Sequence, residues 1–283
     1  MPPRCYVFIM SSLNHPIYRI LQHKRRKLLE KYKVPYTVVM NGKYQPIDAT
    51  YPPLLDDEIM YPMPGYNPSM TLKFLQAVKL YFRSFSTWEE VPDYIIRLNA
   101  TVYLHYPSLW EYLETLPRER VLAGPVNKSM TKTFVNGMVM IFSKEVLRHI
   151  LQDPRVNEQK MLHEYDDVAL SMLAQPYCEF HDMMPFFVYP SSQNTLAQGI
   201  FDLSRIPMHK KWLFRIRHDG SHRQSDIKNW DQLMAHFDEE HESFTGTLAT
   251  PFQNRYSLWL WILFCIVGLV IMVVLISNIR SKI

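Results

Sequence analysis

The sequence predicts an α/β fold followed by a single C-terminal membrane-spanning helix. The chain has 283 residues, enough for one large domain or two small ones. Short apolar runs of β-forming residues alternate with amphipathic helical patterns, which indicates βαβ units and a largely parallel sheet. Near the end of the chain, segment 258–276 contains no charged residue. We therefore expect an α/β body that is tethered to a bilayer.

The first βαβ unit is expected at the start of the chain. A strand, an amphipathic helix and a second strand are predicted at residues 6–10, 17–32 and 36–40. The polar residues that follow the two strands are Ser11, Ser12, Asn41 and Gly42. A right-handed crossover makes the two strands parallel, so these polar residues should lie along the carboxyl edge of the sheet. Ligands bind at that edge in open α/β sheets.

A central strand is predicted to begin at Tyr94. Residues 94–96 are an apolar run, and Arg97 interrupts it. The run resumes at Val102, after a polar turn that contains Asn99 and Thr101. A buried strand that ends in a polar turn can deliver side chains to the ligand-binding edge, and the simpler interpretation is a strand, a turn and another strand.

The remaining elements follow from the same patterns. Helices are expected near residues 70–82, 108–116, 144–152, 168–173 and 226–237, and strands near 58–61, 102–104, 121–123, 134–142, 178–180 and 186–189. Ser143 is a candidate N-cap, with Glu145 in the first helical turn. Gly137 is expected inside the strand 134–142, where glycine often marks a bulge.

The C-terminal segment has the properties of a transmembrane helix. It begins at Leu258, ends at Ile276 and would span about 28 Å at 1.5 Å per residue, close to the thickness of the hydrocarbon core. Interfacial aromatic and basic residues flank it, namely Trp259, Trp261, Arg280 and Lys282. The expected layout is a folded domain, a polar extension with a stalk, a membrane helix and a tail, at 1–212, 213–255, 256–277 and 278–283.

The N-terminal sequence does not resemble a signal peptide, because its apolar run is short and polar residues follow it closely. We therefore expect a tail-anchored protein whose body faces the cytosol. The three cysteines have no short spacing, which argues against a disulfide framework and agrees with that compartment. The Asn-x-Ser/Thr sequences at Asn99 and Asn127 would then carry no glycan.

The charge balance argues against nucleic acid as the main partner. Lysine and arginine number 31 and aspartate and glutamate 27, and three of the basic residues, Arg255, Arg280 and Lys282, lie around the predicted span. The body is therefore nearly neutral. The basic run 23–27 lies within a helical pattern, so a solvated or membrane-facing helix surface is the favoured interpretation over a localisation signal.

Five motifs follow one another along the chain. They are G-Y-N-P-S-M-T-L-K-F-L-Q-A-V-K (65–79), Y-I-I-R-L-N-A-T-V-Y-L-H (94–105), F-V-N-G-M-V-M-I-F-S-K-E-V (134–146), Y-D-D-V-A-L-S-M-L (165–173) and F-H-D-M-M-P-F (180–186). In this order they resemble the T-L-K-T helix, acidic metal motif, glycine-containing strand, E-D-V helix and histidine-bearing segment of the β-1,3-glycosyltransferases of the galactosyltransferase and fringe type. The R-x-N-x-T form of the second motif is also similar to glycosyltransferase-like proteins of large DNA viruses.

The resemblance implies a GT-A fold, with a nucleotide-binding α/β half at about 1–104 and an acceptor-binding half after it. It implies an inverting transfer of a sugar from a nucleotide sugar, most readily a UDP-sugar, to a hydroxyl of a glycan or glycoprotein. Asp167 would be the catalytic base, with Asp166 second. The nucleotide-sugar site would draw on Ser11, Ser12, Asn41, Lys73, Arg97, Asn99, Thr101, Gly137 and His181.

One departure from the family concerns the metal. Where the family has aspartates that bind a divalent cation, this chain has Asn99, Ala100 and Thr101. Because Mn²⁺ and Mg²⁺ prefer anionic oxygen ligands, a neutral amide and a hydroxyl are poor replacements, so a bound Mn²⁺ or Mg²⁺ is possible here but disfavoured. Arg97, Lys73 and Lys128 could instead stabilise the leaving diphosphate.

Two other functions are compatible with the sequence. The first is a non-catalytic protein that binds a glycan or a nucleotide sugar on the same scaffold, which the missing aspartates favour. The second is a tail-anchored adaptor without a ligand. The retained pair Asp166 and Asp167 favours the enzyme.

Overall fold

The computed structural model describes residues 2–12, 16–41, 56–61, 69–128, 132–158, 161, 164–196, 199–217 and 223–238. They belong to one compact unit, Met1–Glu240. Gly42, the predicted stalk and the predicted span 258–276 lie outside the described residues. Among the helices that are described, none is both long enough and apolar enough to cross a bilayer.

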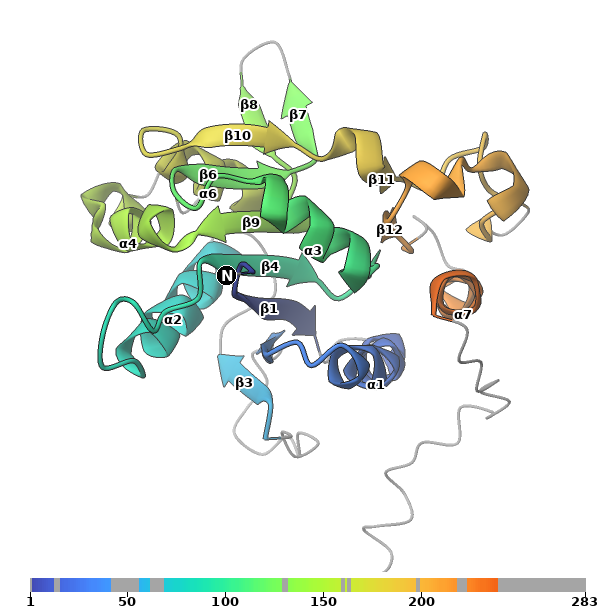
Figure 1. Cartoon of the computed structure of the whole chain (residues 1–283), viewed down its shortest axis with the longest axis horizontal. Helices are drawn as coiled ribbons and strands as arrows, with labels where there is room; N and C mark the ends of the chain where they lie inside the picture. The colour runs from blue at the N-terminus through green and yellow to red at the C-terminus, as the bar shows by residue number, and fades with distance from the viewer. Residues whose placement is uncertain are drawn as a thin grey trace, which may run out of the picture. The chain divides into compact units, whose positions relative to one another are not determined.

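A seven-stranded sheet forms the centre of this unit (Figure 1). In spatial order its strands are β10 (Glu179–Asp182), β6 (Val121–Gly124), β9 (Val139–Ser143), β4 (Tyr94–Asn99), β1 (Cys5–Ser12), β2 (Tyr36–Asn41) and β3 (Glu58–Tyr61). β1 is parallel to both β2 and β4, and β9 is antiparallel to both of its neighbours. The predicted α/β class and the first βαβ unit are confirmed.

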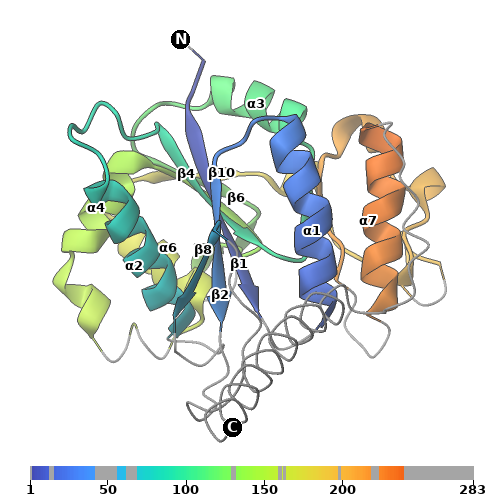
Figure 2. The same ribbon diagram turned by 90° about the horizontal axis from the view of Figure 1, so that it is seen from below.

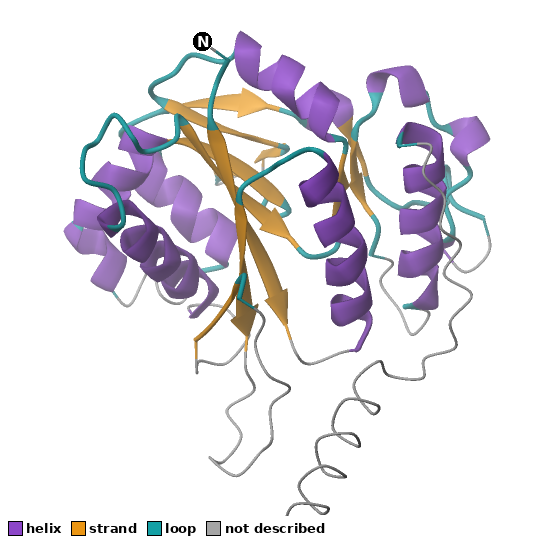
Figure 3. Ribbon diagram, turned by 60° about the horizontal axis from the view of Figure 1, so that its bottom comes forward, coloured by secondary structure: helices purple, strands orange, loops and turns teal. Residues whose placement is uncertain are grey.

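Helices cover both faces of the sheet (Figures 2 and 3). On one face lie α1 (Pro16–Lys31), α3 (Tyr106–Thr115) and α7 (Gln224–Phe237), and on the other lie α2 (Ser69–Arg83), α4 (Lys144–Gln152) and α6 (Asp166–Ala174). Side chains alternate between the faces, so Ile96 and Leu98 of β4 join the core beneath α1, and Ile95 joins the core beneath α2. Arg97 therefore lies on the α2 and α6 face.

Two small sheets complete the unit. One has the order β11 (Phe187–Val188), β12 (Leu213–Arg215) and β5 (Val102–Leu104), and the other pairs β7 (Val126–Lys128) with β8 (Thr133–Val135). Short 3-10 helices occupy Pro154–Asn157, Met184–Phe186, Leu203–Arg205 and Met208–Lys210. β12 pairs with β5, and α7 packs against α1 within the compact unit. The body thus continues past residue 212, the boundary that the polar composition had suggested.

The predicted strand 134–142 is wrong in one respect. It is two strands, β8 and β9, separated by a turn at Gly137. The Asn136 side chain accepts a hydrogen bond from the Met138 amide at 3.0 Å, which closes this turn and diverts the backbone from a strand. Gly137 is consequently a turn residue that lies at the start of β9.

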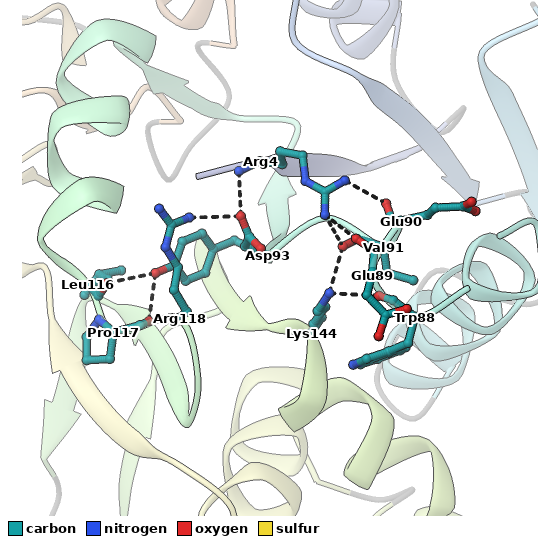
Figure 4. Close-up of polar contacts among 11 residues, drawn as sticks. Arg4, Trp88, Glu89, Glu90, Val91, Asp93, Leu116, Pro117, Arg118 and Lys144 are labelled. Atoms are coloured by element: carbon teal, nitrogen blue, oxygen red, sulfur yellow. Dashed lines mark hydrogen bonds and ion pairs between the residues drawn. The ribbon is translucent and has the colours of Figure 1, made fainter. Parts of the chain in front are cut away.

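Polar contacts hold the amino edge of the sheet together (Figure 4). The Arg4 guanidinium donates to the carbonyl oxygens of residues 89, 90 and 91, and its backbone amide donates to Asp93 at 2.9 Å. Arg118 contacts the same carboxylate at 2.9 Å, and Lys144 donates to the Trp88 carbonyl at 2.8 Å. These contacts tie the loop before β4 to β1 and α4.

Candidate functional site

The carboxyl ends of the parallel strands share one edge of the sheet, as predicted. Ser12 pairs with Asn41 across β1 and β2, and Met10 pairs with Asn99 across β1 and β4. Ser11 lies there too, but it is buried, and its hydroxyl accepts a hydrogen bond from Gln22 of α1. Ser11 therefore has a structural partner inside the protein, whereas ligand binding by Ser12 and Asn41 stays a prediction.

The turn after β4 is closed by its own side chains. Asn99 Oδ1 accepts hydrogen bonds from the Thr101 amide at 3.1 Å and from the Thr101 hydroxyl at 3.0 Å. The Ala100 amide donates to the Met10 carbonyl at 2.9 Å, and the Ile216 amide donates to the Thr101 carbonyl at 3.0 Å. The turn 99–101 is thus fixed to β1 and to the segment after β12.

These residues do not fit a divalent cation. The turn offers no carboxylate, and the amide oxygen of Asn99 already accepts two hydrogen bonds. Within the part of the chain that the structure describes, no group of three or more His, Cys, Asp or Glu side chains could hold a metal ion.

Arg97 connects β4 to the turn at Gly137 and to the start of α6. Its side chain is 1% exposed, and it donates to the Gly137 carbonyl and to the Asp166 carboxylate. Among the described residues its Nε has no partner. The pairing of a buried guanidinium with a carboxylate that is only 19% exposed brings together two predicted site residues that are far apart in sequence.

Asp167 lies beside this ion pair and is half-buried. Its Oδ2 accepts a hydrogen bond from the Gly137 amide at 3.1 Å, and its Oδ1 accepts one from the Val168 amide at 2.9 Å. Burial raises the pKa of Asp167 above its ordinary value and outweighs these two amides, which act in the opposite direction. A carboxylate with a raised pKa is a better proton acceptor than an exposed one.

Glycine is required at position 137 because the side chains of Asp167 and Arg97 lie close to its backbone. A Cβ atom at this position would lie 3.0 Å from the Asp167 Cβ and 3.1 Å from Arg97 Nη1. Absence of a side chain therefore lets the turn approach both residues. The structure brings Arg97, Gly137, Asp166 and Asp167 into one cluster at the carboxyl edge.

Lys73 and His181 belong to other elements than this cluster, namely α2 and β10. Lys73 lies in α2 and is buried, and burial lowers the pKa of its ammonium group to about 8. His181 pairs with Ala123 on the α1 face of the sheet, opposite to Arg97. It also lies three strands from β4, or about 14 Å at 4.8 Å per strand. Their contact with a diphosphate stays a prediction.

A residue that sequence reasoning missed is Arg25 of α1. The prediction that the basic run 23–27 forms a solvated or membrane-facing surface is wrong for this position, because Arg25 is 1% exposed. Its Nη2 donates to the Ala100 carbonyl at 3.2 Å and to the Val102 carbonyl, and its guanidinium lies 5.0 Å from the Trp230 ring centroid. Arg25 therefore supports the turn 99–101 from the α1 face. The signal was present, since Leu21, Arg25, Leu28 and Leu29 share the apolar side of the helix.

Comparison with known proteins places the chain in no family. No protein-family model matches the sequence, and no curated protein matches it. Several solved structures resemble the chain, and among them is one described as a glycosyltransferase involved in the glycosylation of the major capsid of PBCV-1. The alignment covers 79% of this chain and 98% of that protein's chain, with 11% sequence identity and a TM-score of 0.49.

Proposed function

We propose that this protein is a glycosyltransferase that moves a sugar from a nucleotide sugar to an acceptor hydroxyl with inversion. The observation that carries the proposal is the half-buried Asp167, whose pKa is raised by burial, beside the Arg97 and Asp166 ion pair at the carboxyl edge of the parallel sheet. The order of the sequence motifs supports the same class. A UDP-sugar as donor, a glycan acceptor and a membrane tether at 258–276 are parts of this proposal.

The two aspartates have different hydrogen-bond partners, and we assign them different roles accordingly. Asp166 is engaged by the buried Arg97 guanidinium, so its role is to hold α6 against β4. Asp167 contacts only backbone amides among the hydrogen bonds given above, and its basicity is preserved. In the reaction, the acceptor oxygen attacks the anomeric carbon, the bond from that carbon to the diphosphate oxygen breaks, and the hydroxyl proton passes to Asp167.

The experiment compares Asp167→Asn with the wild-type full chain in an assay of nucleoside diphosphate release, using a panel of nucleotide sugars and acceptor glycans. We expect transfer to fall by about 10²–10⁴-fold while nucleotide binding persists, because asparagine keeps the shape and loses the basicity. Asp93→Asn at the amino edge is the control and should leave transfer unchanged. Unchanged transfer in both Asp167→Asn and Asp166→Asn would remove these carboxylates from the chemistry.

A second candidate function is a glycan or nucleotide-sugar binding protein without turnover. It is favoured by the fact that both oxygens of Asp167 accept backbone hydrogen bonds, as expected of a carboxylate that only connects two segments of the backbone. A wild-type protein that binds nucleotide sugars and releases no diphosphate with any acceptor would establish it.

A further inference from the structure

The donor that the turn 99–101 keeps for a ligand is the amino group of the Asn99 side chain, because the amides of the turn already donate to Met138, Met10 and Asn99 itself. Because the Asn99 oxygen accepts from both the amide and the hydroxyl of Thr101, the amino group of the Asn99 side chain remains as the donor for any further partner. Amide N–H groups attract anions and repel cations. The chemistry of this turn therefore favours an anionic ligand over a divalent cation.

A fixed positive charge lies directly behind the turn. The Arg25 guanidinium is 1% exposed, and its Nη2 is within hydrogen-bond distance of the carbonyls of Ala100 and Val102. Among the described residues no carboxylate lies within ion-pair distance of it, and its Nη1 has no hydrogen-bond partner. Burial lowers its pKa to about 10, which still leaves it protonated at neutral pH.

The two buried arginines near the turn differ in what balances their charge. Arg97 is paired with Asp166, whereas the hydrogen bonds of Arg25 within the described part of the chain go to carbonyl oxygens, and its guanidinium lies over the Trp230 ring. A buried charge that is not balanced acts over a longer distance than an exposed one, because little water screens it. Arg25 is thus the stronger source of positive potential at the turn.

We propose that Arg25 replaces the divalent cation, so that the turn 99–101 binds the diphosphate of a nucleotide without a metal. The inference rests on the proposed function, since it assigns the diphosphate of the donor to this turn. Arg25 acts as a positioning residue and as a source of charge from behind the backbone, and it does not itself touch the ligand.

The test measures calorimetric affinities of the full chain in detergent for UDP and GDP, each beside its own nucleoside. A loss of charge at Arg25 should weaken the diphosphate and leave the neutral nucleoside unaffected, whereas a loosened fold would weaken both. We expect Arg25→Gln to weaken the preferred diphosphate about tenfold, or about 1.4 kcal/mol, with nucleoside affinity within about twofold. Arg25→Lys keeps the charge and should stay within about threefold of the wild type.

Arg26→Gln is the matched control. It removes a positive charge from the adjacent position of α1, where Arg26 pairs with Asp57 at 2.6 Å, and it should leave both affinities unchanged. EDTA or added Mn²⁺ should change the wild-type diphosphate affinity by less than about threefold. A tenfold gain with Mn²⁺ overturns the inference, and so does an Arg25→Gln protein that binds the diphosphate like the wild type or that loses both ligands equally.

If Arg25→Gln does not fold, Arg25→Lys decides the matter, because a tenfold loss of diphosphate affinity in that folded variant also overturns the role of charge. A wild-type protein that binds neither diphosphate nor nucleoside overturns the proposed function together with this inference. Binding of the wild type with no selective effect at Arg25 overturns the inference alone.

Discussion

Arginine and aspartate side chains occur at both edges of the central sheet, but they have different roles there. At the amino edge, Arg4 binds carbonyl oxygens and Arg118 binds the Asp93 carboxylate (Figure 4). The side chain of Arg118 is 44% exposed. At the carboxyl edge, the side chains of Arg97 and Arg25 are each 1% exposed. An exposed ion pair is screened by water and contributes little, whereas a buried one depends strongly on its partner.

The two edges also differ in how strongly water screens their cations. The cations at the amino edge form contacts that hold loops in place, and water also reaches these loops. The carboxyl-edge cations are held away from water, and each keeps one nitrogen without a partner among the described residues. Burying such groups costs free energy unless something else compensates it, and an anionic ligand would do so. This contrast is why we place the site at the carboxyl edge.

Breaking one ion pair at each edge should cost far more stability at the carboxyl edge than at the amino edge. Arg97→Met leaves the Asp166 carboxylate largely buried without its partner and should lower the free energy of unfolding by about 3–5 kcal/mol. Arg118→Met, at the amino edge, should lower it by less than about 1 kcal/mol. Chemical denaturation of both variants measures the difference. Equal costs at the two edges would remove the distinction on which the comparison depends.

A smaller effect is expected from Gly137→Ala, which places a methyl group against Asp167 and Arg97 at about 3 Å. Crowding of this kind should cost about 1–3 kcal/mol of stability, and displacement of Asp167 should reduce transfer as well. Gly199→Ala is the control, because Gly199 has φ +74° and lies outside the cluster. That variant should lose about 1 kcal/mol of stability through its backbone and keep its transfer rate. Full activity in Gly137→Ala would show that the exact position of Asp167 is unimportant.

Much of the carboxyl edge could be predicted because the signals that define it are local. Apolar runs located β1, β2 and β4, and the parallel order of these strands placed Ser12, Asn41 and Asn99 at one edge. The contact of Arg97 with Asp166 could not be derived, because 69 residues separate them and neither sequence motif encodes the partner. The turn at Gly137 was missed since a strand pattern continues on both sides of it.

Other parts failed for identifiable physical reasons. The charged neighbours of Arg25 in sequence predict a solvated or membrane-facing surface, although its helical position lies among the leucines of α1. β12 is only three residues long, too short to show an alternating pattern, so the polar composition around it hid a strand that pairs with β5. In both cases tertiary packing decided the outcome against local composition.

The pH dependence of stability should be a small effect, and the test is whether the free energy of unfolding increases or decreases as the pH falls. Asp167 has a pKa raised by burial, so the folded state binds its proton more tightly than the unfolded state does. The buried charge is then a cost at neutral pH that disappears as the pH falls through the folded pKa toward the unfolded value near 4. Asp153 is the opposite case, because hydrogen bonds from Arg155 lower its pKa, and the stability that it contributes is lost as the pH falls.

Urea denaturation of the wild type, Asp167→Asn and Asp153→Asn between pH 7 and pH 3.5 separates these two signs. The free energy of unfolding of the wild type relative to Asp167→Asn should increase as the pH is lowered, whereas the same difference relative to Asp153→Asn should decrease. Because each comparison is a difference between the wild type and one variant, the titration of groups that the substitution does not affect cancels. A difference for Asp167→Asn that decreases with falling pH would mean that its two backbone amides outweigh burial. Asp167 would then have a structural role, connecting Gly137 to α6 by hydrogen bonds, like the carboxylates at the amino edge.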